Sequence, residues 1–223
     1  MRKVIGAAFV SLDGVIQSPG GVSEDTTGGF ANGGWVFRAW DDGVNDAIGR
    51  LFGGDYALLL GRRTYDIFAA YWPFVTGEEA EMGKAFTNAY KYVLTRGEAP
   101  LDWANSHRLT SIEDIAALKR TDGPDLVIQG SSTLYPALLA AGLLDRLTLM
   151  TFPLTTGPGK RLFEAGTPGA MLRLTEHKVT DKGTLIASYE PAGALPPVPD
   201  FAPQPATSAR EAERQARMTE GTW

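Results

Sequence analysis

The chain has 223 residues, of which 43% are hydrophobic and 21% charged, a composition typical of one globular domain. It has no cysteine and two histidines, which excludes disulfides, thiolate catalysis and a histidine-rich metal centre. The net charge of −5 and the lack of an apolar run of roughly 18–20 residues argue against nucleic acid and membrane as partners, so a cytoplasmic location is the default expectation.

Strand-like and helix-like segments alternate along most of the chain. Short apolar runs predict strands over residues 3–10, 56–60, 91–94, 107–109, 126–129 and 146–152. Amphipathic or capped segments predict helices over residues 41–52, 62–70, 78–85, 111–119 and 132–141. This alternation predicts an α/β fold with a mixed, mostly parallel sheet flanked by helices.

The segment after the first predicted strand, residues 14–35, is rich in glycine and contains no clear helix or strand pattern. Aromatic residues lie within and directly after it, and we expect Phe30, Trp35 and Phe37 to anchor it. Long loops in compact domains are usually functional or disordered. We therefore expect residues 14–34 to form a mobile lid or a substrate-shaping loop.

The last fifty or so residues contain a predicted hairpin, then a proline-rich segment and a short predicted helix. Residues 171–180 and 184–190 predict an antiparallel hairpin around a turn at 181–183. Six of the 14 prolines then fall between residues 191 and 205, and a short polar helix is predicted over 208–218. We divide the chain into a domain over 1–190 and an arm over 191–223, which is either a disordered tail or docks on a neighbouring subunit through Phe201, Met218 or Trp223.

Two strand-to-helix turns carry the residues most suited to binding an anion. At the first, a buried strand ends at Gly61 and the helix opens with Arg62, Arg63 and Thr64. Helix N-termini leave N–H groups unpaired, and arginine matches phosphate oxygens. A capped helix with two solvated arginines would give the same pattern.

The second turn follows the strand over 126–129. Gln129 and Gly130 precede three hydroxyl residues and one leucine: Ser131, Ser132, Thr133 and Leu134. The hydroxyls can cap the helix or bind a phosphate with its free N–H groups. A third strand ends at Thr95 and Arg96, and parallel sheets place ligands at the carboxyl ends of their strands. The glycine patterns of Rossmann folds and P-loops are absent.

The order of these segments resembles the dihydrofolate reductase family. It is closest to the riboflavin biosynthesis reductase (RibD C-terminal) domain and its stand-alone relatives. The resemblance is carried by residues 60–65, 91–96 and 128–135, with 11–16, 142–147 and 153–163 in matching order. It covers roughly residues 3–190, and it implies a dihydrofolate-reductase-like fold that binds NADPH.

The resemblance also implies roles for the two turns. Gly61, Arg62, Arg63 and Thr64 match the segment that holds the cofactor phosphates. Thr95 and Arg96 match the strand end near the adenosine 2′-phosphate. The segment from Gln129 to Leu134 matches the turn around the pyrophosphate and nicotinamide ribose, and the segment from 13 to 17 matches the loop over the nicotinamide.

The catalytic and substrate residues are less clearly marked. Asp13 and Asp41 are the candidate proton donors, with water as the alternative, although an aspartate at a helix start is more often a cap. Trp35 and Trp72 are candidates for an apolar wall against a flat substrate, or for core packing. Dihydrofolate reductase has a run of glycines where this chain has Gln129-Gly130-Ser131, so folate itself is a doubtful substrate.

The sequence thus predicts an NADPH-dependent reductase that transfers a hydride to a small heterocyclic or carbonyl/imine substrate, of riboflavin-pathway or pterin type. One alternative is a non-catalytic nucleotide-binding module that keeps the fold, and another is an assembly protein that acts through its arm. The resemblance further implies a homodimer.

Overall fold

The apolar runs of the sequence form one sheet in this computed structural model, which describes residues 1–200 and 207–222. Within these residues the sheet has eight strands in the order β4-β3-β2-β5-β1-β6-β8-β7. The first six strands run parallel to their neighbours, whereas β8 is antiparallel to both β6 and β7. The strands are β1 (Val4–Ser11), β2 (Tyr56–Gly61), β3 (Lys91–Leu94), β4 (Ser106–Leu109), β5 (Asp125–Gln129), β6 (Arg146–Phe152), β7 (Ala170–Val179) and β8 (Leu185–Ala194). The predicted fold class is confirmed.

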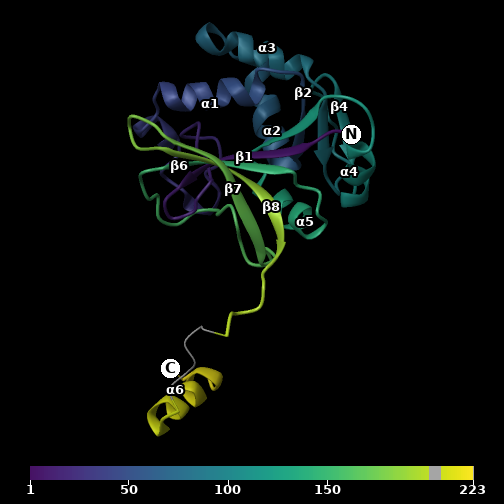
Figure 1. The fold of residues 1–223 in the computed structure, drawn as a ribbon. Helices are drawn as coiled ribbons and strands as arrows, with labels where there is room; N and C mark the ends of the chain where they lie inside the picture. The colour runs from purple at the N-terminus through teal and green to yellow at the C-terminus, as the bar shows by residue number, and fades with distance from the viewer. Residues whose placement is uncertain (201–206, 223) are drawn as a thin grey trace.

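Helices cover both faces of this sheet, with α1 and α3 on one side and α5 on the other (Figure 1). They are α1 (Asp42–Phe52), α2 (Arg62–Tyr71), α3 (Ala80–Asn88), α4 (Ile112–Lys119), α5 (Tyr135–Ala140) and α6 (Ala209–Thr219). Neighbouring residues of β1 point to opposite faces. Ala7 packs with Val44 of α1, and Ala8 with Leu138 of α5, so each face has its own apolar core.

Local capping explains where two of the helices begin. The Asp41 carboxylate accepts a hydrogen bond from the backbone N–H of Val44, at the start of α1. Ser111 and Asp114 form a reciprocal capping box at the start of α4. These side chains pair N–H groups that a helix leaves without partners, so both starts follow from local sequence.

Two differences from the predicted elements concern the end of the sheet and the second glycine turn. β8 continues through Pro191 to Ala194, so the predicted boundary at residue 190 falls inside a strand. Beyond Tyr189 the strand pairs with β7 alone, and a proline without an N–H therefore costs no bond toward β6. The helix predicted over 132–141 opens as a 3-10 turn, Ser132–Leu134, before α5.

The C-terminal arm lies partly outside the described residues, including Phe201 and Trp223. Its helix α6 begins at the serine cap that the sequence predicts, where the Ser208 hydroxyl accepts a hydrogen bond from the Glu211 N–H at 3.1 Å. No residue of α6 is buried. Within the described part of the chain, no helix has both the length and the apolar character needed to cross a bilayer.

Candidate functional site

The carboxyl ends of the parallel strands bring the predicted anion-binding segments to one edge of the sheet. β2 ends at Gly61, β3 leads into Thr95 and β5 ends at Gln129. After β1 the chain continues to α1 on one face of the sheet, and after β5 it continues to α5 on the other. Such a switch point between adjacent strands is where open α/β sheets bind ligands.

The two glycine turns lie in direct contact at this edge. The Gly61 N–H donates a hydrogen bond of 3.0 Å to the Ser131 hydroxyl, which is buried. A Cβ on Gly61 would lie 3.7 Å from the Thr133 hydroxyl oxygen, and one on Gly130 would lie 3.7 Å from Thr64 Cγ2. Five of the predicted residues therefore form one continuous lining.

The backbone of both turns leaves donors available. No side chain caps the start of α2, so its first N–H groups have no partner of that kind. Gly130 and Ser131 adopt positive φ angles of 75° and 50°, a conformation that residues other than glycine rarely adopt. The Ser131 carbonyl accepts the Leu134 N–H at 2.9 Å, which holds this unusual turn in place.

The three arginines of the predicted site have different roles. Arg62 pairs with Asp66 at 2.9 Å, and its guanidinium also donates to the carbonyls of Ala99 and Pro100. Arg62 therefore fastens the segment after β3 to α2. Arg63 and Arg96 are exposed, and neither side chain has an ion pair or hydrogen bond among the described residues. These two remain available to a phosphate.

The other predicted residues of this edge are partly buried. The Thr95 hydroxyl accepts the Gly97 N–H at 3.2 Å. Leu134 as a whole is 3% exposed and belongs to the core, and its N–H is bonded to the Ser131 carbonyl, so it shapes the turn from beneath. The side-chain oxygen of Gln129 is buried and has no hydrogen-bond partner in the structure, a costly state for a polar group.

Asp13 and Asp41, the candidate proton donors, are both held by backbone amides. Asp13 accepts from the N–H groups of Thr156 and Gly157 at 3.2 and 2.9 Å. Burial alone would raise the pKa of Asp13, but these bonds and one from Ser11 outweigh it and lower that pKa. The pKa of Asp41 is lowered in the same way, against desolvation, chiefly by the Lys182 N–H. Both carboxyls are therefore ionised at neutral pH.

The two candidate tryptophans lie in different parts of the core. Trp35 is fully buried beside Phe152, and its indole N–H donates to the Gln17 carbonyl at 2.8 Å. Trp72 is partly buried and packs edge-to-face against Phe86, with 4.8 Å between the ring centroids. The structure does not bring them together as one wall, and Trp35 has no exposed surface to offer a substrate.

A second structural element of this edge was not predicted. The loop after β1 is fastened to the loop after β6, so the segment expected to be mobile is anchored. Lys160 donates from its ammonium group to Asp25 at 2.5 Å and to Thr27 at 2.6 Å, and from its backbone to Gln17 at 3.0 Å. We call this set of contacts the loop clasp. Phe30 is 6% exposed and anchors the loop as predicted, whereas Phe37 is 59% exposed.

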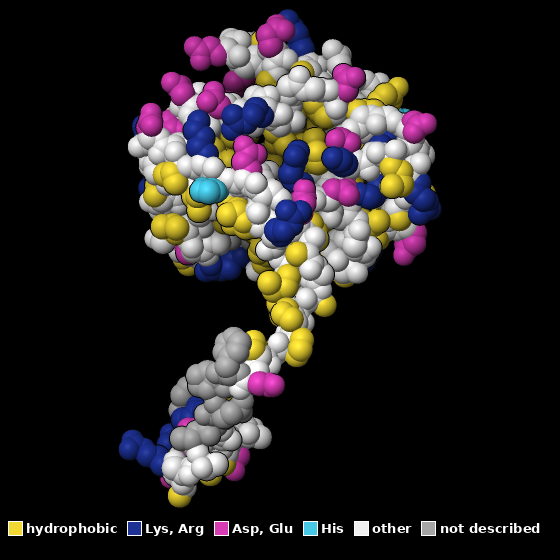
Figure 2. All heavy atoms as spheres, in the orientation of Figure 1, with side chains coloured by type: hydrophobic (Ala, Val, Ile, Leu, Met, Phe, Trp, Pro, Cys, Tyr) yellow, Lys and Arg dark blue, Asp and Glu magenta, His cyan; other side chains and the backbone are white. Residues whose placement is uncertain are grey.

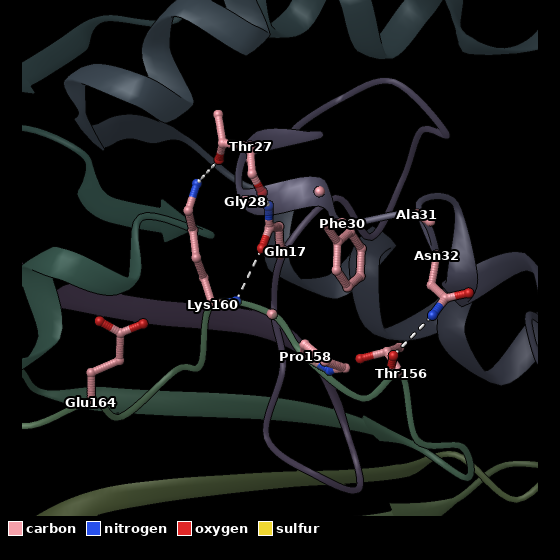
Figure 3. Close-up of a pocket in the computed structure, with 12 residues that line it drawn as sticks. Gln17, Thr27, Gly28, Phe30, Ala31, Asn32, Thr156, Pro158, Lys160 and Glu164 are labelled. Atoms are coloured by element: carbon pink, nitrogen blue, oxygen red, sulfur yellow. Dashed lines mark hydrogen bonds between the residues drawn. The ribbon is translucent and has the colours of Figure 1, made fainter.

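The loop clasp forms one side of an open pocket of about 450 Å³ (Figure 3). Figure 3 shows the Lys160 side chain reaching Thr27, and the Asn32 amide turned toward Thr156 on the far side. The Thr156 hydroxyl is buried without a partner. Little in the sequence signals the clasp, because Asp25 and Lys160 are 135 residues apart in the chain.

Metal ligands do not gather at this edge. Within the described residues, no group of three or more histidine and acidic side chains is placed to hold a metal ion. The donors that do gather are backbone N–H groups, hydroxyls and two free arginines. This donor set suits a phosphate-bearing ligand.

A mostly parallel sheet with an antiparallel C-terminal hairpin and helices on both faces is a dihydrofolate-reductase-like fold. The sequence profile of the RibD C-terminal domain matches residues 2–186. The chain therefore belongs to the RibD C-terminal domain family.

Individual relatives agree with this assignment. The uncharacterized protein YyaP of Bacillus subtilis (strain 168) is 27% identical over 168 residues, which span 73% of this chain and 80% of that protein. A putative riboflavin biosynthesis protein from Shewanella sp. PV-4 has a similar structure, with a TM-score of 0.58 and 17% identity, over 85% of this chain and 99% of that one.

A dihydrofolate reductase from Enterococcus faecalis, solved with NADP(H) and RAB-propyl, is also similar in structure. Its TM-score is 0.53 at 16% identity, over 85% of this chain and 96% of that one. At these identities the structural likeness establishes the fold.

Proposed function

We propose that this protein is an NADPH-dependent reductase that transfers a hydride to a small heterocyclic or carbonyl/imine substrate, of the riboflavin-pathway or pterin type. The single observation that carries the proposal is the contact between the two glycine turns, through the Gly61 N–H and the Ser131 hydroxyl. Family membership supports it, as does the similar fold of a reductase solved with NADP(H).

The residues present fit a phosphate-bearing cofactor. The space that a Cβ on Gly61 would occupy is bordered by the hydroxyls of Thr133 and Ser131 at 3.7 and 3.8 Å. This is a cradle open enough for a phosphate oxygen and lined with donors. The free N–H groups at the start of α2 add the positive end of a helix dipole.

We propose that Arg63 and Arg96 favour NADPH over NADH. Both are exposed cations without partners among the described residues, and they follow neighbouring strands β2 and β3. An arginine can form an ion pair with the 2′-phosphate of NADPH, whereas the ribose 2′-hydroxyl of NADH carries no charge to pair with. Arg62 cannot contribute in its present position, because Asp66 and two carbonyls occupy its guanidinium.

NADPH, when bound, supplies the hydride, and the chain supplies position and electrostatics. The turns would orient the cofactor at the switch point, and the loop after β1 would shield the reacting atoms from water. Asp13 and Asp41 are ionised and already bonded to backbone amides, so neither is a ready acid. We propose water as the proton source, with the two aspartates as positioning residues.

A second candidate is a nucleotide-binding module without turnover. The same observation favours it, because an edge that carries phosphate donors but no free acid can bind a cofactor without completing a reduction. Under this second proposal NADPH still binds, but no nicotinamide absorbance is lost with any substrate.

We also propose a homodimer. β7 is an edge strand paired only with β8 in the described part of the chain, and it exposes Met171, Leu174 and Val179 at 42, 48 and 63%. An edge strand presents unpaired backbone groups, and pairing with a second chain is one way to cover them. Light scattering should give twice the mass of the chain, and Leu174→Lys should give a monomer. A monomeric wild type would contradict this.

The proposed function is tested by titrating NADPH against tryptophan fluorescence in the wild type and in Gly61→Ala. Gly61 has a φ of −79°, and its added Cβ would make ordinary contacts at 3.7 Å or more, so the variant should fold normally. We expect its NADPH affinity to fall by about tenfold or more, because the methyl group fills the phosphate cradle.

Turnover is then followed by loss of nicotinamide absorbance with pterin, ribityl-pyrimidine and simple carbonyl substrates. Absence of wild-type NADPH binding at millimolar concentration contradicts both candidate functions. Binding without turnover on any of these substrates favours the second candidate.

A further inference from the structure

A hollow on the face of the sheet under α1 carries an unusual set of charges. It has a volume of about 160 Å³ and is lined by Arg50 of α1, Arg146 of β6 and Lys178 of β7. Figure 2 shows Lys and Arg side chains on this face, between α1 and the β7–β8 hairpin, with Asp and Glu side chains among them. The chain as a whole has a net charge of −5, so an excess of cations here is local.

The two arginines have no side-chain partner for their charge among the described residues. Neither Arg50 nor Arg146 makes a side-chain hydrogen bond or ion pair among the described residues. Lys178 pairs with Asp46 at 3.5 Å, and Glu176 is the acidic residue on the rim. Arg50 lies in the last turn of α1, where a cation also stabilises the helix dipole. Arg146 opens a strand and has no such role.

The floor of the hollow offers a hydrogen-bond donor. The hydroxyls of Thr148 and Ser188 lie 2.9 Å apart, and Ser188 is 8% exposed. Two hydroxyl groups have two hydrogens, and the bond between them uses one. Neither hydroxyl contacts another acceptor among the described residues, so the second hydrogen is free to meet a ligand.

We propose that this hollow binds a phosphate-type oxyanion. The volume suits one phosphoryl group and is below the roughly 300 Å³ at which sites for whole small molecules begin. Arginine forks supply paired donors for tetrahedral oxyanions, and the hydroxyl pair supplies a further one from below. The group is either free inorganic phosphate or the phosphoryl end of a small metabolite.

This site is separate from the proposed cofactor edge. Arg146 is the first residue of β6 and pairs with Ile5 near the start of β1, so it lies at the amino end of the parallel strands. The glycine turns lie at the carboxyl ends of the same sheet. Phosphate binding in the hollow therefore does not depend on whether the carboxyl edge binds NADPH, and the two proposals can fail separately.

The test is isothermal titration calorimetry with inorganic phosphate and with glycerol phosphate, in a phosphate-free buffer of constant ionic strength. We expect saturable binding to the full chain. Arg50→Gln and Arg146→Gln should each weaken it by about five- to tenfold, because each removes a charge-assisted hydrogen bond. Glu176→Gln should strengthen it by a few fold, because a repelling carboxylate is lost.

Two control variants make the outcome specific. Arg210→Gln removes an exposed arginine of α6, a helix with no buried residue that contributes nothing to the lining of the hollow, and should leave phosphate binding unchanged. Arg63→Gln removes a cation of the proposed cofactor edge and should also leave it unchanged. Thermal unfolding of each variant confirms that Arg50→Gln has not loosened α1.

Equal affinity for the two ligands identifies free phosphate as the occupant, and tighter binding of glycerol phosphate identifies a phosphoryl end; either supports the site. Absence of saturable binding overturns the proposal. So does a loss of binding in Arg63→Gln with none in Arg146→Gln, since the anion would then belong to the carboxyl edge.

Discussion

The Gly61 amide donates a 3.0 Å hydrogen bond to the Ser131 hydroxyl and so joins two turns that are 70 residues apart in the chain. Ser131 can accept this bond because it adopts a left-handed backbone conformation after Gly130. The bond fixes the spacing between the start of α2 and the turn after β5. That spacing sets the size of the ligand that the edge can hold.

The first prediction compares Gly130→Ala with Gly142→Ala. Both glycines have positive φ, 75° and 63°, and neither added Cβ would meet an atom closer than 3.7 Å. Backbone strain should cost each variant about 1 kcal/mol of stability. Only Gly130→Ala should also lower the affinity for NADPH, by about tenfold, as measured in a fluorescence titration. Equal NADPH affinity in the two variants would remove the second turn from the site.

The second prediction separates the three arginines. Arg63→Gln and Arg96→Gln should each lower NADPH affinity by about tenfold and leave NADH affinity nearly unchanged, because the lost cation faces the 2′-phosphate. Arg62→Gln should affect both cofactors alike and lower stability by less than about 1 kcal/mol, since its ion pair is partly exposed. A selective NADPH loss in Arg62→Gln would contradict the assignment.

The third prediction concerns Asp41. Its folded-state pKa is lowered, so its stabilising effect is present at neutral pH and is lost as the pH falls below about 3.8 and through that lowered value. Asp41→Ala should cost about 1 kcal/mol through loss of the α1 cap. Asp41→Asn should retain most of the cap and flatten the acid limb of a plot of melting temperature against pH.

NADPH affinity should be unchanged in Asp41→Asn. A loss of turnover by a hundredfold or more, with fold and cofactor affinity intact, would instead support Asp41 as the proton donor.

The fourth prediction concerns Lys91, which is fully buried and donates to the carbonyls of Phe86 and Thr87. Burial lowers its pKa from 10.5 to about 8. Between these values the unfolded chain binds the proton more tightly, so this residue makes stability rise with pH across that window. In Lys91→Met the rise in stability that is due to Lys91 should vanish. Denaturant midpoints of the wild type and the variant at pH 8 and pH 10 measure it. Parallel pH profiles would contradict it.

The fifth prediction tests the loop clasp. Asp25 has a side chain 9% exposed against Lys160, and hydrogen bonds from Lys160 and Thr27 lower its pKa despite burial. Asp25→Asn should cost about 1–3 kcal/mol and speed hydrogen exchange across residues 17–32. The matched control is Glu81→Gln, which breaks an exposed pair with Lys84 and should change neither quantity. Unchanged exchange in Asp25→Asn would mean that the backbone bonds alone hold the loop.

Local sequence determined the elements and the edge at which they meet. The strand at 91–94 and the strand at 146–152 lie where their apolar runs predicted them, because a buried strand needs a run of that length and little else. The caps at Asp41 and Ser111 predicted two helix starts, since a cap acts on its own first turn. Alternation predicted the parallel sheet, and parallel strands must share a carboxyl edge.

Only the tertiary structure decided which side chains meet there. Arg62 and Arg63 are adjacent in sequence, yet the first is taken by Asp66 and two carbonyls while the second is free. β8 crosses the predicted boundary at residue 190 because β7, and not its own proline, sets its length. The loop clasp and the hollow under α1 depend on contacts between distant segments. Periodicity reports which face of an element is buried, and it contains no information about which other element covers that face.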